Sequence, residues 1–125
     1  MVNSQEERGL NVRKQVLGEE YVTRAAENAD EFTSPLQSFL NTNCWGLVWT
    51  RPGLDLRTRS VITLAILAVT GKPAELGAHV RGALRNGLTP EEVAEIFLHI
   101  SVYAGVPTAV EAFRVAQPVI AEART

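Results

Sequence analysis

A carboxylate and an imidazole stand four residues apart at Glu75 and His79. Residues at this spacing share one face of a helix, so the carboxylate of Glu75 can orient the ring of His79 and hold a proton on it. A neighbouring carboxylate also raises the pKa of a histidine, which keeps the ring protonated nearer neutral pH. The pair therefore predicts a proton-transfer site without a metal, a thiol or a bound cofactor, with His79 as the general acid. A structural pair at a subunit contact is the alternative.

Three arginines lie within nine residues around the start of a predicted helix: Arg51, Arg57 and Arg59. A guanidinium group binds a carboxylate through two parallel hydrogen bonds, and the free N–H groups of a helix N-terminus also attract anions. The cluster predicts a site for a substrate that carries carboxylates. A solvated turn, whose arginines pair with acidic side chains, is the alternative for each of them.

Four further residues could line the same pocket. Ser60 and Thr63 are three apart on an otherwise apolar helix, where their hydroxyls could donate to a carbonyl oxygen of a ligand. They could equally bond back to backbone carbonyls one turn earlier. Trp45 and Trp49 are four apart and would line one helix face, against which a planar ligand could pack and exclude water. Core or interface packing is the expectation for at least one of these tryptophans.

The second histidine and two more arginines are weaker candidates. His99 shares an apolar helix face with Phe97 and Ile100, which favours a core or interface residue over a catalytic one. Arg81 and Arg85, again four apart, favour a stripe on a surface or interface, although Arg81 is close enough to His79 to be a second choice for the site.

Size and charge narrow the class of protein. The chain has 125 residues, which suits one domain, residues 1–125, with a single core. Its net charge is −2 without a block of like charge, so we expect neither nucleic acid nor a membrane as a partner. Residues 1–8 are polar, unlike a signal peptide, and the longest apolar run, 61–69, is too short for a bilayer of about 30 Å. The single cysteine, Cys44, excludes an internal disulfide. We expect a cytoplasmic protein.

Helical periodicity prevails along the whole chain, and no segment alternates like a strand. The pattern predicts an all-α domain of six or seven short helices. Their expected ranges are 4–17, 19–28, 34–49, 56–70, 73–86, 90–103 and 108–122.

Local signals support these boundaries. Thr89 is followed by a proline and, at the third helical position, by Glu92, which predicts a capping box. Gly71 and Gly87 are placed to end helices in the left-handed conformation. The segment 61–69 is apolar on nearly every side, so we expect it in the core or at a large subunit interface. The surplus of apolar residues predicts a homo-oligomer.

Four segments carry a resemblance to a known family: 45–55, 57–65, 79–89 and 103–107. Together they resemble the carboxymuconolactone decarboxylase family, and weaker similarity extends back through Phe32. The resemblance implies an alkylhydroperoxidase D-like fold, a homo-oligomer (a hexamer or a trimer) and no cofactor. It also implies the decarboxylation of 4-carboxymuconolactone to 3-oxoadipate enol-lactone and CO₂, in the degradation of protocatechuate.

The same superfamily contains thiol peroxidases, which this chain does not match. Their motif is a glutamate followed by two cysteines and a histidine, spaced CxxCxxxH. Alignment of that histidine on His79 puts Lys72 and Glu75 at the cysteine positions and Ser60 at the glutamate. Peroxide chemistry needs a thiolate, so this departure excludes the peroxidase function.

The resemblance also implies a substrate, a small lactone with two carboxylates. Loss of CO₂ sends electrons into the lactone carbonyl, so neither pyridoxal phosphate, thiamine nor a metal is required. The protein must bind the carboxylates, stabilise the developing oxyanion and donate a proton to carbon. A decarboxylase or isomerase-like family member that acts on another small lactone or unsaturated acid is one alternative, and a non-enzymatic oligomeric binding protein is the other.

Overall fold

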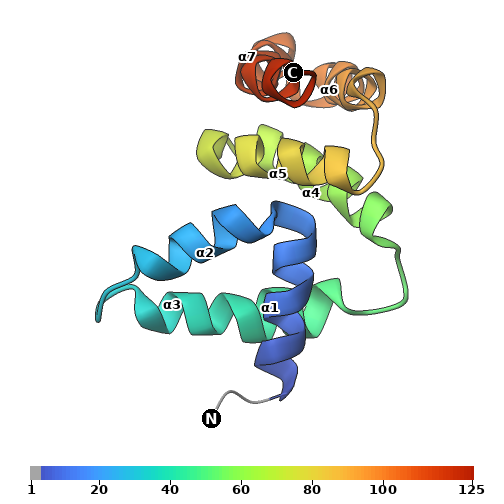
Figure 1. Cartoon of the computed structure of the whole chain (residues 1–125). Helices are drawn as coiled ribbons and strands as arrows, with labels where there is room; N and C mark the ends of the chain where they lie inside the picture. The colour runs from blue at the N-terminus through green and yellow to red at the C-terminus, as the bar shows by residue number, and fades with distance from the viewer. Residues whose placement is uncertain (1–3) are drawn as a thin grey trace. The chain divides into compact units, whose positions relative to one another are not determined.

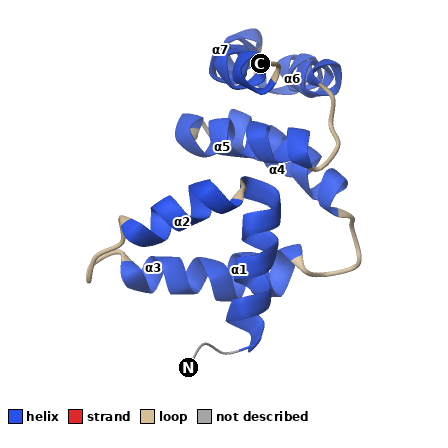
Figure 2. Ribbon diagram, viewed as in Figure 1, coloured by secondary structure: helices blue, strands red, loops and turns tan. Residues whose placement is uncertain are grey.

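A computed structural model of the chain describes residues 4–125; the first three residues of the polar segment 1–8 lie outside this range. Seven α-helices and one π-helix make up the described part, and no strand occurs in it, which confirms the all-α prediction (Figures 1 and 2). The elements are α1 (Ser4–Leu17), α2 (Glu19–Glu27), α3 (Ser34–Phe39), η1 (Leu40–Trp49), α4 (Leu56–Val69), α5 (Pro73–Arg85), α6 (Pro90–Ala104) and α7 (Val106–Ala123). None of the helices within residues 4–125 is long and apolar enough to cross a membrane.

The chain forms two compact units, one up to Asp55 and one from Leu56 to Thr125. In the first unit, α1 packs closely against η1 through two glycines. A Cβ on Gly9 would lie 1.7 Å from the carbonyl oxygen of Asn41, and one on Gly46 would lie 2.5 Å from that of Gln5. Only glycine permits such an approach of two backbones, so a side chain at either position would force the helices apart.

The π-helix η1 departs from the sequence prediction of one continuous α-helix over 34–49. The chain is helical throughout that range, but after Phe39 the hydrogen bonds change to the wider π pattern. Apolar residues four apart, such as Trp45 and Trp49, suit both kinds of helix, so periodicity does not distinguish them. Extended π-helix is rare, and short π segments are frequent at functional sites.

A buried arginine joins the helices of the first unit. Arg13 on α1 is only 6% exposed, and its Nη1 donates to Oε1 of Gln37 (2.9 Å) and to Oδ1 of Asn41 (3.0 Å). Burial lowers the pKa of this guanidinium. Burial also raises the pKa of the nearby Cys44 thiol, an effect that the charge of Arg13 partly opposes. Cys44 is therefore a partly buried, protonated thiol.

The second unit is a four-helix arrangement around one apolar core. Figure 1 shows α4 and α5 in one layer and α6 and α7 in the other, and α4 also contacts α6 while α5 contacts α7. Each helix turns a stripe of apolar residues with helical spacing inward. The stripes are Leu64 and Ala68; Leu76, Val80 and Ala83; Val93, Phe97 and Ile100; and Ala112 and Ala116.

The predicted helix ends of this unit are largely confirmed. Thr89 Oγ1 accepts from the Glu92 backbone N–H (3.1 Å), and a Glu92 carboxylate oxygen accepts from the Thr89 N–H (3.0 Å), which completes the capping box. Gly71 and Gly87 have φ angles of 68° and 99°, as helix stops in the left-handed region require. The predicted break over 105–107 is wrong in extent. Only Gly105, with φ of 103°, interrupts the helices, because a proline suits the first turn of α7.

The apolar helix α4 is buried on one side only. Leu64 faces the core, whereas Ile66 on the opposite side is 55% exposed. The other layer shows the same feature, since Val102 on α6 is 79% exposed. The core position predicted for segment 61–69 is therefore confirmed for one side of the helix, and a subunit interface on its exposed side stays a prediction.

Candidate active site

The predicted acid–base pair lies in the first two turns of α5. Pro73 occupies the first turn, where its missing N–H costs nothing, and Glu75 and His79 follow one turn apart. Glu75 is exposed, whereas His79 is partly buried between the core residues Ala78 and Val80. The two side chains are close enough for the carboxylate charge to act on the ring.

The pKa of His79 is lowered, whereas the sequence predicted that it would be raised. Burial lowers its pKa from 6.5 to about 4, and the carboxylate of Glu75 opposes this effect only in part. The predicted direction was wrong because Glu75 stands in water, which screens its attraction, while the ring itself has lost most of its hydration. At pH 7 the imidazole is neutral, so it can accept a proton. It becomes an acid only when nearby negative charge favours the protonated form.

The arginines of α4 differ in their surroundings. Arg57 donates to the carboxylate of Glu92, the residue that also caps α6. Hydrogen bonds from the Thr89 backbone and from Arg57 lower the pKa of Glu92, so this carboxylate stays ionised. Arg57 therefore pairs with an acidic side chain of the protein, as the alternative to substrate binding predicted. Arg59 is partly buried two residues further along α4.

The two hydroxyls of α4 make internal hydrogen bonds. Ser60 is fully buried, and its Oγ accepts from Nδ2 of Asn86 at 2.9 Å. Asn86 also reaches the carbonyl of Leu56 at 3.3 Å, so it joins the end of α5 to the start of α4. Thr63 Oγ1 donates to the carbonyl of Arg59 at 2.8 Å, one turn earlier. Thr63 therefore makes the backbone hydrogen bond that was predicted as its alternative to binding a ligand. Ser60 is a structural anchor, and its partner Asn86 was not predicted.

The tryptophans and Arg51 belong to the first unit. Trp45 and Trp49 are both buried, with ring centroids 4.6 Å apart and planes at 28°, so the indoles stack on each other. Arg51 is exposed just beyond the end of η1. The predicted spacing of the indoles on one helix face is confirmed, and packing is the role that their burial supports.

His99 does not lie in the core, which is one of the two alternatives predicted for it, and an interface position stays a prediction. It is exposed on α6, with its ring centroid 5.3 Å from that of Tyr103. The ring borders a groove of about 560 Å³ between α4 and α6, lined also by Val61 and by Glu95. Glu95 precedes His99 by four residues, so the molecule holds a second pair with the spacing of Glu75 and His79.

Comparison with known proteins places these features in context. The model of the "Carboxymuconolactone decarboxylase family" matches residues 35–118. The 4-carboxymuconolactone decarboxylase of Acinetobacter baylyi is 44% identical over 111 residues, which are 89% of this chain and 83% of that protein. The nitrosuccinic acid decarboxylase npaB of Metarhizium robertsii is 47% identical over 112 residues, 90% of this chain and 78% of that protein. An uncharacterized 15.0 kDa protein of Paracoccus denitrificans is 39% identical over 80 residues, 62% of this chain and 60% of that protein.

Proposed function

This chain belongs to the carboxymuconolactone decarboxylase family and is a carboxy-lyase, and from that premise we propose that its substrate is 4-carboxymuconolactone. The products are 3-oxoadipate enol-lactone and CO₂, and the reaction belongs to the degradation of protocatechuate. The observation that carries the proposal is the 44% identity, over 89% of this chain, to a relative of that name.

The proposed reaction suits a protein that supplies binding groups and one proton. In 4-carboxymuconolactone, one of two carboxylates sits on a saturated ring carbon that is joined through a C=C bond to the lactone carbonyl. When the bond to this carboxylate breaks, CO₂ leaves and the electron pair moves through the C=C bond into the carbonyl. A proton then adds to the carbon next to that carbonyl. The substrate itself takes up the electron pair, so the protein needs only to bind, to stabilise the oxyanion and to protonate.

His79 is the proposed proton donor, with Glu75 favouring its charged form. The free ring, with a pKa of about 4, is neutral at pH 7. Two substrate carboxylates near the ring favour the imidazolium. His79 therefore takes up a proton as the substrate binds, and it delivers this proton to carbon after CO₂ has left.

Arg59 is the first choice among the three arginines for a substrate carboxylate. It is partly buried, and an ion pair with a ligand is screened less there than at the exposed Arg51. Arg57 already pairs with Glu92, so its proposed contribution is to hold α4 and α6 together. Trp45 and Trp49, which stack on each other within η1, are assigned a packing role in the first unit.

A second candidate substrate is nitrosuccinic acid, because the relative named for its decarboxylation is 47% identical to this chain. Nitrosuccinic acid is also a small dicarboxylate, and its nitro group can take up the electron pair that CO₂ leaves behind. The demands on the protein are the same: two carboxylates to bind, an anion to stabilise and a proton to place on carbon.

We also propose a homo-oligomer, for which the exposed apolar side chains of the second unit are the support. Ile66 on α4 and Val102 on α6 are examples of large apolar residues that are more than half exposed in the single chain. Monomeric proteins seldom expose many such residues on neighbouring helices. Sedimentation of the purified protein tests this proposal, and a monomer at all concentrations would contradict it.

The substrate is tested by adding purified protein to each compound separately. With 4-carboxymuconolactone we expect equal amounts of CO₂ released and of ultraviolet-absorbing substrate lost, in the presence or absence of a chelator. A larger kcat/KM for nitrosuccinic acid would favour the second candidate. If neither compound releases CO₂ faster than it does without protein, both substrates are wrong.

A further inference from the structure

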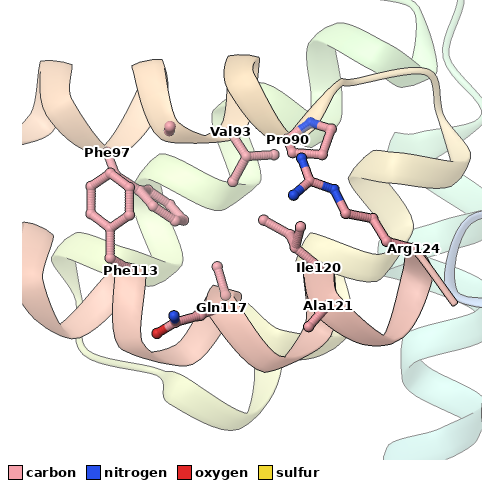
Figure 3. A pocket seen from close by; sticks show the side chains of 10 residues that line it. Pro90, Val93, Phe97, Phe113, Gln117, Ile120, Ala121 and Arg124 are labelled. Carbon is pink, nitrogen blue, oxygen red and sulfur yellow. The ribbon is translucent and has the colours of Figure 1, made fainter.

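A cavity of about 510 Å³ lies between α6 and α7, away from the pair on α5. In Figure 3, Phe97 and Phe113 meet at one end of this cavity, and their rings are edge to face with centroids 5.5 Å apart. Val93 and Ile120 form the middle of the wall. Since Val93 and Phe97 belong to the core, the floor of the cavity is rigid and apolar.

The opposite end of the cavity is cationic. The side chain of Arg124, just after the end of α7, reaches toward Pro90 at the start of α6 (Figure 3). Its Nη2 lies 3.5 Å from a carboxylate oxygen of Glu91, with the two side chains 62% and 77% exposed. An ion pair this exposed is held weakly, and the guanidinium has five N–H donors in all. Arg124 can therefore turn donors toward a ligand in the cavity.

The dimensions indicate the length of the ligand. The cavity runs along α6 from Pro90 to Phe97, a distance of about 10 Å at the helical rise per residue. Its volume is in the range of small-molecule sites, which are mostly apolar with a few polar groups that fix orientation. Here the polar groups are the guanidinium of Arg124 and the amide of Gln117.

We infer that the cavity between α6 and α7 binds a monocarboxylate with an apolar tail about 10 Å long. The tail lies between Val93 and Ile120 and ends against Phe97 and Phe113. The carboxylate is bound by Arg124. Charge decides the orientation, because the only cation that borders the described cavity stands at one end and the aromatic rings at the other. The inference is independent of the decarboxylase reaction, since neither Glu75 nor His79 lines this cavity.

Octanoate and its uncharged analogue octanamide are suitable probes, and NMR shift mapping and calorimetry on the full chain are suitable measurements. We expect octanoate to shift the resonances of residues that line the cavity and to bind about tenfold more tightly than octanamide, since charge-assisted hydrogen bonds are roughly twice as strong as neutral ones.

The variant R124Q should weaken the binding of octanoate about tenfold and leave the binding of octanamide unchanged. E91Q should tighten octanoate binding, because it removes a competing carboxylate.

Arg114 supplies the matched control. It lies on α7, just after which Arg124 follows, is exposed, and pairs with Glu111 at 3.0 Å outside the cavity. R114Q changes the net charge as R124Q does, and it should leave octanoate binding unchanged. H79Q should also bind octanoate normally, which separates this test from that of the proposed reaction.

Three outcomes would overturn the inference. Equal binding of octanoate and octanamide would mean that Arg124 does not bind the carboxylate. An equal loss in R114Q and R124Q would mean a nonspecific charge effect. If octanoate shifts no resonance of the lining residues, the cavity does not bind it, and conversion of an oligomer to a monomer by F113D would then show that a second copy of the chain covers the cavity.

Discussion

The molecule contains two glutamate–histidine pairs of identical spacing, and their surroundings differ. Glu75 and His79 lie on α5, where the ring is partly buried beside core residues and burial lowers its pKa to about 4. Glu95 and His99 lie on α6, where the ring is exposed next to Tyr103. The spacing determines which side chains can approach each other, but the burial of the histidine ring determines how strongly desolvation opposes the effect of the carboxylate on its pKa. Identical local sequence patterns therefore do not imply identical chemistry.

The reason lies in the position of each residue on its helix. His79 is partly buried on α5, and the burial of its ring outweighs the charge of the exposed Glu75 one turn earlier. His99 precedes the buried Ile100 but points out of the layer formed by α6 and α7 into the groove that Val61 borders.

The largest expected effect is on turnover. We expect H79Q to lower kcat/KM at least about 100-fold, because a positioned general acid contributes this much. H99Q, the matched change in the second pair, should stay within about twofold of the unaltered protein. Steady-state rates of CO₂ release measure both. A large loss in H99Q with little loss in H79Q would transfer the acid–base role to the exposed pair.

The next effect is on stability against pH. The pKa of His79 is about 4 in the folded chain and 6.5 when unfolded, so between these values the unfolded chain binds more protons. Stability is therefore complete above pH 6.5 and falls as the pH drops toward 4, by about 3 kcal/mol for a difference of this size. Denaturant unfolding at pH 7 and at pH 4, for the unaltered protein and for H79Q, isolates this contribution. Equal pH dependence in both proteins would mean that the ring is not desolvated.

A smaller effect concerns the anchor that positions α5. N86A removes the donor to Ser60 Oγ, and it leaves that buried hydroxyl unsatisfied at a cost of about 1–3 kcal/mol. The free energy of unfolding from denaturant titration measures the loss. The double variant S60A/N86A should recover part of it, since both polar partners are then absent. Full additivity of the two single variants would show that the hydrogen bond contributes nothing.

The smallest expected effect is the change that the Glu75 carboxylate makes to the pKa of His79. Because Glu75 raises the pKa of His79, E75Q should lower that pKa further, by less than about 1 for a screened, exposed charge. E95Q should not change it. NMR titration of the His79 ring protons measures both variants. A rise of the pKa in E75Q would contradict the assigned direction.

Much of the helical framework was predictable because its signals are local. The capping box at Thr89 and the stops at Gly71 and Gly87 each depend on a few adjacent residues, and the structure has them where the sequence predicted. The family resemblance was also predictable, since it is carried by short contiguous segments. The π-helix η1 was missed, because residues four apart fit both helix types.

The sequence predicts candidate residues for the site, but it does not predict the hydrogen-bond and ion-pair partners of those residues. The sequence predicts a ligand or a backbone carbonyl as the partner of Ser60, whereas in the structure its hydroxyl accepts from Asn86, which is 26 residues away. Arg57 was expected to bind carboxylate, and the carboxylate it binds is that of Glu92, 35 residues away. Partners at such separations come together only when α4, α5 and α6 pack.

Most helix ends and the spacing of the chemical groups on the helices follow from local sequence, because each of these depends on bonds within one or two turns. The charge of His79, the partners of Ser60 and Arg57 and the cavity beside Arg124 depend instead on how the helices pack. The physical reason is that desolvation and long-range hydrogen bonds arise where distant segments exclude water from one another. The sequence pattern predicts which side chains share a helix face, and the packing of the helices determines the burial, charge and hydrogen-bond partners of each.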